Sequence, residues 1–242
     1  MKQIKAISFD FWETLVSGKH NAVGRVEHRL NKLNEILSKY RNFTIEEIKN
    51  AYDESSNIFT KVWINDYKTL CAEESIKIIL ELLELDISQK HFDELVYEFE
   101  YSLLDFPPKL FSELVDLLPK LKERFPLAII CDTGYSSGKV LREFLEREKV
   151  LSNFSTFVFS NEVLSSKPNA KNYEIVCESF GIQTNELLHI GDNQRSDIAG
   201  IQNVGGTGFL FAETNRKWVE GTTAEVILNS WNEFESALEK YL

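Results

Sequence analysis

Several polar residues stand directly behind apolar runs of the chain, where a strand would end. Asp10 follows the run Ile4–Phe9 in this way. A strand that ends in a polar residue presents it at the carboxyl edge of its sheet, where open α/β sheets build their sites. Comparable positions later in the chain are Cys131, Asp132, Thr133, Lys167, Asp192 and Asp197. Aspartates beside one lysine suit a Mg²⁺ site next to a phosphate site, because hard cations bind carboxylate oxygens and lysine binds phosphate oxygens.

The segments that must position these residues alternate between strand and helix patterns. After Phe106-Pro107-Pro108, which ends any preceding helix, the apolar patterns predict helices over 110–124, 140–148, 172–180, 197–203 and 231–242. Between them, strands are predicted over 127–131, 157–159, 187–190, 208–211 and 224–228, in addition to an N-terminal strand over 5–9. This alternation predicts an α/β fold with a doubly wound parallel sheet and helices on both faces.

A helical insertion separates the first strand from the rest. Residues 21–104 contain no convincing strand, and their apolar residues recur at helical spacing in four stretches. Thr44-Ile45-Glu46-Glu47 has the form of a capping box, which starts the second of these helices. Four amphipathic helices with short polar links predict a small bundle.

Composition narrows the class of protein and partner. The net charge of −11 argues against a nucleic-acid footprint, although a small anionic substrate remains compatible with it. The three scattered cysteines form no metal or disulfide pattern, which fits a reducing cytoplasm. The N-terminal apolar run is too short for a signal peptide, and no run is long enough for a membrane span. We therefore expect a cytoplasmic protein with a small-molecule substrate, either a monomer or a homodimer.

The motifs, taken in order, resemble those of the haloacid dehalogenase (HAD) superfamily, in the branch with a helical cap after the first motif. They are Phe9-Asp10-Phe11-Trp12-Glu13-Thr14-Leu15, Ile129-Ile130-Cys131-Asp132-Thr133-Gly134, Lys167-Pro168, and Gly191-Asp192 with Asp197. The resemblance covers the whole chain. It implies a HAD-like α/β core of residues 1–16 and 107–242 and a four-helix cap of residues 17–106.

The resemblance also implies roles for the motif residues. Asp10 would attack phosphorus and form an aspartyl-phosphate. Mg²⁺ would be held by Asp10, by the backbone carbonyl of Trp12 and by Asp192. Lys167 would stabilise the nucleophile and the transferring group, while Asp197 would orient Lys167 or a metal-bound water. Together with Lys167, the phosphate-binding residues would be Cys131, Asp132 and Thr133.

Two residues depart from the family pattern. Phosphatases of this family usually carry an aspartate at the position of Trp12, where it protonates the leaving alcohol and later activates water; indole can do neither. Cys131 stands where a serine or threonine hydroxyl normally binds phosphate, and a thiol is a weaker donor. General acid–base catalysis is worth roughly 10²–10⁴ in rate. We therefore expect a slow phosphatase that acts on a small phosphorylated metabolite.

Two alternatives remain open. The first is a carbon-centred hydrolase of the dehalogenase type, in which an aromatic residue also stands two places after the nucleophile, although that subgroup lacks the Gly191-Asp192 pair. The second is a binding or regulatory protein that has lost catalysis, which Trp12 and Cys131 would favour. In the cap, Trp63, Tyr67 and Arg25 could reach a substrate, but most cap aromatics are expected to form core. The histidines, including His189, show no ligand-like spacing.

Overall fold

The computed structural model describes residues 3–242 and divides into two compact units. The sheet unit extends to Gly18 and includes Lys109–Asp132 and Leu145–Leu242. The helical unit consists of Lys19–Pro108 together with Thr133–Phe144. The division expected from the sequence did not include this last segment in the helical part.

A six-stranded parallel sheet forms the centre of the sheet unit, in the order β5-β4-β1-β6-β7-β8. This confirms the predicted doubly wound α/β fold. The strands are β1 (Ala6–Phe9), β4 (Leu127–Cys131), β5 (Thr156–Phe159), β6 (Leu187–Gly191), β7 (Thr207–Phe211) and β8 (Val226–Leu228). Phe9 of β1 pairs with Ile129 on one side and Ile190 on the other. The carboxyl ends of these three strands are therefore level, at the point where the strand order reverses.

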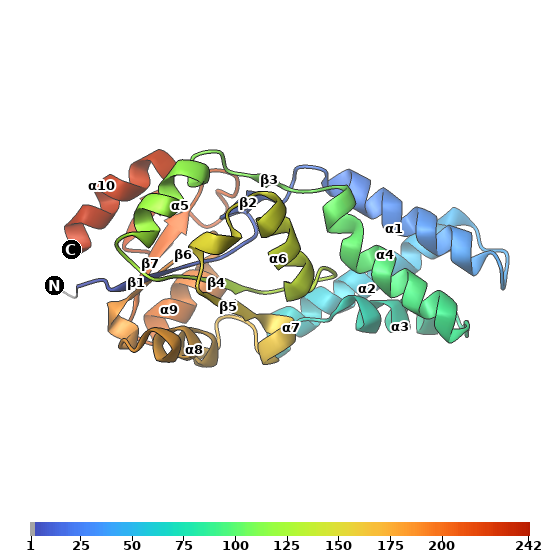
Figure 1. The fold of residues 1–242 in the computed structure, drawn as a ribbon. Coiled ribbons are helices and arrows are strands. Elements are labelled where there is room, and N and C mark those ends of the chain that lie inside the picture. The colour runs from blue at the N-terminus through green and yellow to red at the C-terminus, as the bar shows by residue number, and fades with distance from the viewer. Residues whose placement is uncertain (1–2) are drawn as a thin grey trace. The chain divides into compact units, whose positions relative to one another are not determined.

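Helices cover both faces of this sheet (Figure 1). On one face lie α8 (Ala170–Phe180) and α9 (Ala199–Asn203), and on the other lie α5 (Leu114–Lys122) and α10 (Phe234–Leu238). Side chains of β1 alternate between these faces, as the pleat requires. Ala6 joins a buried cluster with Val176 of α8, whereas the Phe9 ring packs against Trp231 with centroids 5.9 Å apart. Short helical segments complete the unit: η1 (Leu151–Asn153), α7 (Ser160–Val163) and η2 (Thr184–Glu186). Residues 3–242 contain no helix that is both long and apolar enough to cross a membrane.

Three predicted helices differ from the structure. The helix predicted over 110–124 begins only at Leu114, because β3 (Lys109–Leu110) pairs antiparallel with β2 (Val16–Ser17). The segment predicted over 197–203 starts earlier, as the π-helical turn η3 (Gln194–Ile198), since Asn193 accepts backbone hydrogen bonds at its start. The closing helix is broken into η4 (Trp231–Glu233), α10 and η5 (Glu239–Tyr241). Two-residue strands and single turns are too short to produce a periodic pattern.

The helical unit contains the four predicted helices: α1 (Ala22–Leu37), α2 (Ile45–Asp66), α3 (Ala72–Leu82) and α4 (Gln89–Asp105). The predicted capping box is present, with Thr44 N donating to Glu47 Oε2 at 2.7 Å and Glu47 N donating to Thr44 Oγ1 at 3.2 Å. The helices share one apolar core, which includes Leu33, Ile48, Ile76, Leu95 and Phe99. Burial of this stripe, rather than helix propensity, holds the bundle together.

The segment Thr133–Phe144 joins the helical unit through Tyr135 and Ser136. The Tyr135 ring stacks on Tyr52 at 6.0 Å and meets Phe99 edge-on at 5.3 Å. Ser136 Oγ donates to the carbonyl of Glu100 at 2.8 Å. Most of α6 (Gly138–Arg147) follows in this segment. These contacts explain why a segment that directly follows β4 belongs with the helices.

Candidate active site

The Asp10 carboxylate is held by the tight turn that follows β1. Asp10 N donates to the Ile190 carbonyl at 2.8 Å, which continues the strand pairing. The chain then turns back on itself, as Leu15 N and Val16 N both donate to the Phe11 carbonyl. This brings the buried Thr14 hydroxyl to 3.4 Å from Asp10 Oδ2. Trp231 Nε1 donates to the backbone carbonyl of Thr14 at 3.2 Å, which holds the turn in place.

Lys167 joins residues from three of the motifs. Its Nζ lies 2.5 Å from Asp10 Oδ1 and 2.6 Å from Asp197 Oδ1, and only 3% of the residue is exposed. Its backbone N donates to Asp132 Oδ1 at 2.9 Å, which fixes the loop that carries it. Burial would lower the pKa of Lys167, but the adjacent carboxylates prevail and raise it well above its usual value. Lys167 is therefore a permanent cation between two carboxylates.

Asp197 is the most completely bound carboxylate of the group. Its Oδ1 meets both Lys167 Nζ and His189 Nε2, the latter at 3.1 Å. Its Oδ2 accepts from Asn193 N at 3.0 Å and from Ser196 Oγ at 3.2 Å. Burial opposes ionisation, yet Lys167 and His189 hold the pKa of Asp197 below its usual range. Gly191 makes room for this side chain, since a Cβ there would lie 2.2 Å from Asp197 Cγ.

His189 also belongs to this network, through hydrogen bonds that the absence of ligand-like spacing did not address. The carboxylate of Asp197 can only accept, so the proton lies on Nε2 and Nδ1 accepts from the Ser8 hydroxyl at 2.9 Å. Burial lowers the pKa of His189 and keeps the ring neutral. One feature of the sequence could have indicated this role: Ser8 and His189 are polar residues within otherwise apolar strands. In the structure they are direct partners in the β1–β6 register.

Tyr173 of α8 was also missed by the sequence analysis. Its buried hydroxyl donates to the Ser196 carbonyl at 2.9 Å, one residue before Asp197. Burial raises the pKa of Tyr173 well above its usual value, so the phenol stays protonated. Tyr173 thus fixes the backbone that carries Asp197 rather than contributing charge to the site.

Oxygen donors for a metal ion converge at the same edge of the sheet. Asp10, Asp192 and Asp197 each offer a ligand atom, and these atoms lie within 4.8 Å of one another. Burial, with the Asp197 charge beside it, raises the pKa of Asp192 to about 7, although Asn215 Nδ2 donates to its Oδ2 at 2.6 Å. Burial also raises the pKa of Asp10. Both pKa shifts arise first from burial and then from the neighbouring carboxylates, and buried carboxylates grouped in this way suit a hard divalent cation.

The remaining predicted site residues lie in different environments. Cys131 is buried at the end of β4, and burial raises the pKa of its thiol well above the usual value, so it stays neutral. Thr133 is buried and belongs to the helical unit. The Trp12 ring meets Phe11 edge-on at 5.1 Å and packs over Gly18, where a Cβ would lie 3.0 Å from Trp12 Cε3. Nothing in this indole could transfer a proton.

In the helical unit, one candidate residue is structural. Arg25 is buried, and its Nη1 donates to the carbonyls of His20 at 3.0 Å and Phe106 at 2.7 Å, which ties together the two ends of the insertion. Trp63 is half-buried and Tyr67 is exposed at the end of α2.

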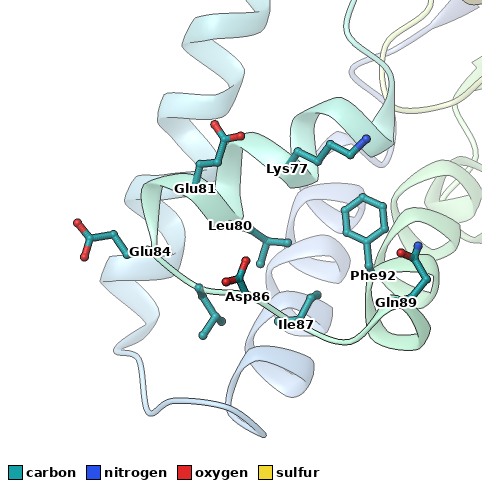
Figure 2. Close-up of a pocket in the computed structure, with 9 residues that line it drawn as sticks. Lys77, Leu80, Glu81, Glu84, Asp86, Ile87, Gln89 and Phe92 are labelled. Atoms are coloured by element: carbon teal, nitrogen blue, oxygen red, sulfur yellow. The ribbon is translucent and has the colours of Figure 1, made fainter.

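A surface pocket of about 440 Å³ lies at the α3–α4 connection of the helical unit (Figure 2). Its apolar lining residues include Leu80, Ile87 and Phe92, and Glu84 points away from them. None of the motif residues lines this pocket.

Comparison with known proteins agrees with this arrangement. The family model of haloacid dehalogenase-like hydrolases matches residues 4–205. Pyrimidine 5'-nucleotidase YjjG from Escherichia coli is 30% identical over 128 residues, which cover 52% of this chain and only 56% of that relative.

Two solved structures share the fold. A 2-haloacid dehalogenase from Pseudomonas syringae is similar with a TM-score of 0.77 at 16% identity, covering 99% of this chain and 100% of that one. The HAD-hydrolase YfnB from Bacillus subtilis, bound to magnesium, has a TM-score of 0.68 at 18% identity and covers 98% and 99% of the two chains.

Proposed function

Because the chain belongs to the haloacid dehalogenase-like hydrolases, we propose that it is a Mg²⁺-dependent phosphatase that uses Asp10 as its nucleophile. The observation that carries this proposal is the contact of Asp10 Oδ1 with Lys167 Nζ at 2.5 Å, beside the Asp192 and Asp197 carboxylates. A cation beside the nucleophile lowers its repulsion toward a phosphate dianion and stabilises the charge that develops on the transferring group. The nucleotidase relative adds support for a phosphate ester as substrate.

The reaction takes place in two displacements at phosphorus. A carboxylate oxygen of Asp10 attacks phosphorus, the ester P–O bond breaks, and the alcohol leaves with a proton from solvent. Water then attacks phosphorus of the aspartyl-phosphate, which releases inorganic phosphate and restores the carboxylate. Lys167 stays protonated in both steps, and it binds the phosphoryl oxygens while the phosphoryl group is attached to Asp10. The neutral Cys131 thiol donates weakly to phosphate.

Asp10, Asp192 and the backbone carbonyl of Trp12 would hold the Mg²⁺ ion. When bound, the ion supplies positive charge that screens the carboxylate from the incoming phosphate. Both oxygens of Asp197 already have protein partners, among them Lys167 and His189. We therefore assign Asp197 to positioning Lys167, and not to direct coordination.

Trp12 sets the kind of substrate that is turned over well. Since no acid protonates the leaving alcohol, esters with good leaving groups react faster than alkyl esters. We expect Trp12→Asp to raise turnover of an alkyl phosphate by roughly 10²-fold, the lower range of general acid–base catalysis. An unchanged rate in a folded variant that still binds Mg²⁺ would contradict this account of Trp12.

The direct test is hydrolysis of an aryl phosphate with Mg²⁺ or with EDTA. We expect turnover that requires Mg²⁺ and disappears in Asp10→Asn. Asp116→Asn is the matched control, because Asp116 is an exposed aspartate of the same unit. A panel of small phosphorylated metabolites, with 5'-nucleotides included, then defines the substrate. Failure of every ester in folded protein would instead favour a binding or regulatory role.

Two observations favour a second candidate, a carbon-centred hydrolase: an aromatic residue follows the nucleophile by two places, and a dehalogenase shares the fold. The Asp192 carboxylate beside Asp10 argues against it, since a metal-free reaction leaves this negative charge uncompensated. Release of halide from a 2-haloacid in EDTA would overturn the phosphatase proposal. Halide release is measured alongside phosphate release, with Asp10→Asn as the blank for both.

A further inference from the structure

The Asp192 carboxylate is held by fewer groups than the other two carboxylates of the candidate metal site. Asp10 contacts the ammonium group of Lys167 and a hydroxyl, and both oxygens of Asp197 have protein partners. Among residues 3–242, only Asn215 forms a hydrogen bond with the Asp192 side chain, from Nδ2 to Oδ2 at 2.6 Å. The other oxygen, Oδ1, has no hydrogen-bond partner among these residues. One side chain therefore sets the orientation of the Asp192 carboxylate.

Hydrogen bonds at both ends of its amide fix Asn215 in one orientation. Its Oδ1 accepts from the backbone N of Lys217 at 3.2 Å, which closes a turn typical of asparagine. Its Nδ2 donates to Asp192, and because a carboxylate can only accept, the amino group must face that side. Turning the amide over would place its oxygen against the carboxylate and its amino group against an N–H. The donor is therefore in place before any ion binds.

The loop that carries Asn215 joins β7 to β8 and is attached at two points to the segments that carry the metal ligands. Thr214 Oγ1 donates to Glu13 Oε2 at 2.6 Å, within the turn that follows β1. Thr222 Oγ1 donates to Gln194 Oε1 at 2.6 Å, in η3, which follows β6. All of these residues belong to the sheet unit. The position of Asn215 thus depends on contacts inside one compact unit.

A neutral donor suits this position beside a metal ligand. A lysine or arginine would neutralise the negative charge that attracts a cation, and a second carboxylate would repel Asp192. An amide occupies one carboxylate oxygen and adds no charge. Mg²⁺ requires near-ideal octahedral geometry, so a ligand that can rotate freely costs affinity. Groups that hydrogen-bond a ligating side chain are typically worth about 10- to 100-fold in metal affinity.

We propose that Asn215 is a positioning residue of the Mg²⁺ site, which holds Asp192 through Oδ2 and leaves Oδ1 for the ion. This inference rests on the Mg²⁺ site of the proposed function, but not on the hydrolysis of any ester. Asn215 itself does not bind the ion, because its Oδ1 is engaged by the Lys217 backbone and its Nδ2 is a donor. Its contribution is therefore to the affinity for Mg²⁺ rather than to the chemical steps.

The test measures the Mg²⁺ dissociation constant by titration calorimetry, without substrate, in the wild-type protein and in Asn215→Ser. The serine hydroxyl can still accept from the Lys217 N–H, as serine does in turns, but it is one bond shorter and cannot reach Asp192. We expect the dissociation constant to rise by about 10- to 100-fold. Urea denaturation in EDTA verifies that the variant is folded.

Asn229→Ser is the matched control, because it makes the same chemical change at another contact of the same loop. Asn229 Oδ1 accepts from Arg216 Nη1 at 2.9 Å, so this asparagine holds the residue next to Asn215. We expect the Mg²⁺ dissociation constant of Asn229→Ser to stay within about twofold of the wild-type value. An equal rise in both variants would overturn the proposal, because the structure of the loop in general would then set the affinity.

The aryl phosphate assay adds a readout that a merely structural role would not change. The Mg²⁺ concentration for half-maximal turnover should rise in Asn215→Ser by the same factor as the dissociation constant, and saturating Mg²⁺ should restore turnover. A folded variant that binds Mg²⁺ as tightly as the wild-type protein would overturn the positioning role and leave the phosphatase proposal standing. Wild-type protein that binds no Mg²⁺ would overturn both. Mg²⁺ binding that depends on Asn215 would support this inference even if no ester is hydrolysed.

Discussion

Each unit contains a buried cation, and the two cations differ in the groups that surround them. Lys167 in the sheet unit is 3% exposed and meets two carboxylates at 2.5 and 2.6 Å. Arg29 in the helical unit is 7% exposed and meets a hydroxyl and two aromatic rings instead. The fold itself neutralises the first charge, so that site is organised before any ligand arrives. Among residues 3–242, no carboxylate pairs with the second charge.

The chemistry of the two side chains fits these roles. A lysine ammonium is a compact point charge, and here it bridges Asp10, which follows β1, and Asp197, which lies in η3. An arginine guanidinium is a planar fork, and stacking on Tyr135 fixes its plane without consuming its terminal donors. Three substitutions test this contrast.

The largest expected effect is on Lys167. We expect Lys167→Met to lower the free energy of unfolding by about 3–5 kcal/mol, because it leaves the Asp10 and Asp197 carboxylates buried without their cation. Urea denaturation monitored by circular dichroism measures the change. Lys171→Met is the control: the ammonium group of this exposed lysine donates to the Val163 carbonyl, and its loss should cost less than about 1 kcal/mol. Equal losses of unfolding free energy in Lys167→Met and Lys171→Met would show that the two carboxylates do not depend on Lys167 for their stability.

A smaller effect is expected at Gly191, which allows Asp197 to reach Lys167. A Cβ at Gly191 would lie 2.2 Å from Asp197 Cγ, so Gly191→Ala must displace that carboxylate. We expect a loss of about 1–3 kcal/mol in the free energy of unfolding, the usual cost of overpacking. At Gly134 the nearest atom would lie 3.9 Å from the new Cβ, so Gly134→Ala serves as the control. A Gly191→Ala protein of wild-type stability would show that the Asp197 carboxylate can move without loss of its hydrogen bonds.

The smallest effect is expected at Arg29 itself. Arg29→Met should change the free energy of unfolding by less than about 1 kcal/mol, because removing a buried charge that has no carboxylate partner offsets the loss of its contacts with Ser102 and the two rings. Arg25→Met should lower it by about 1.5–3 kcal/mol, since hydrogen bonds from a charged group to carbonyls are lost. Parallel urea titrations give both values. A larger loss for Arg29→Met than for Arg25→Met would show that the contacts with Ser102 and the two rings outweigh the cost of burying the charge.

Much of the candidate site could be predicted from local pattern. Asp10, Asp132, Asp192 and Asp197 each follow an apolar strand, and parallel strands bring such ends to one edge of a sheet. His189 could not be recognised in this way, because its role depends on its register opposite Ser8 and on its contact with Asp197. Tyr173 and Arg29 likewise resembled ordinary helix residues. Spacing along a helix shows which face is apolar, but not whether a buried polar group on it has a partner.

The sequence by itself determined the order of strands and helices, the helical insertion after the first strand, and the residues available for chemistry. These follow from periodicity and from residue type, which act over a few neighbouring positions. Only the tertiary structure decided which charges meet: Lys167 and Asp10 are 157 positions apart, and their contact depends on how β1, β4 and β6 align. It likewise decided that Lys167 is neutralised and Arg29 is not. The energy of a buried charge depends on all the groups packed around it, and those come from distant parts of the chain.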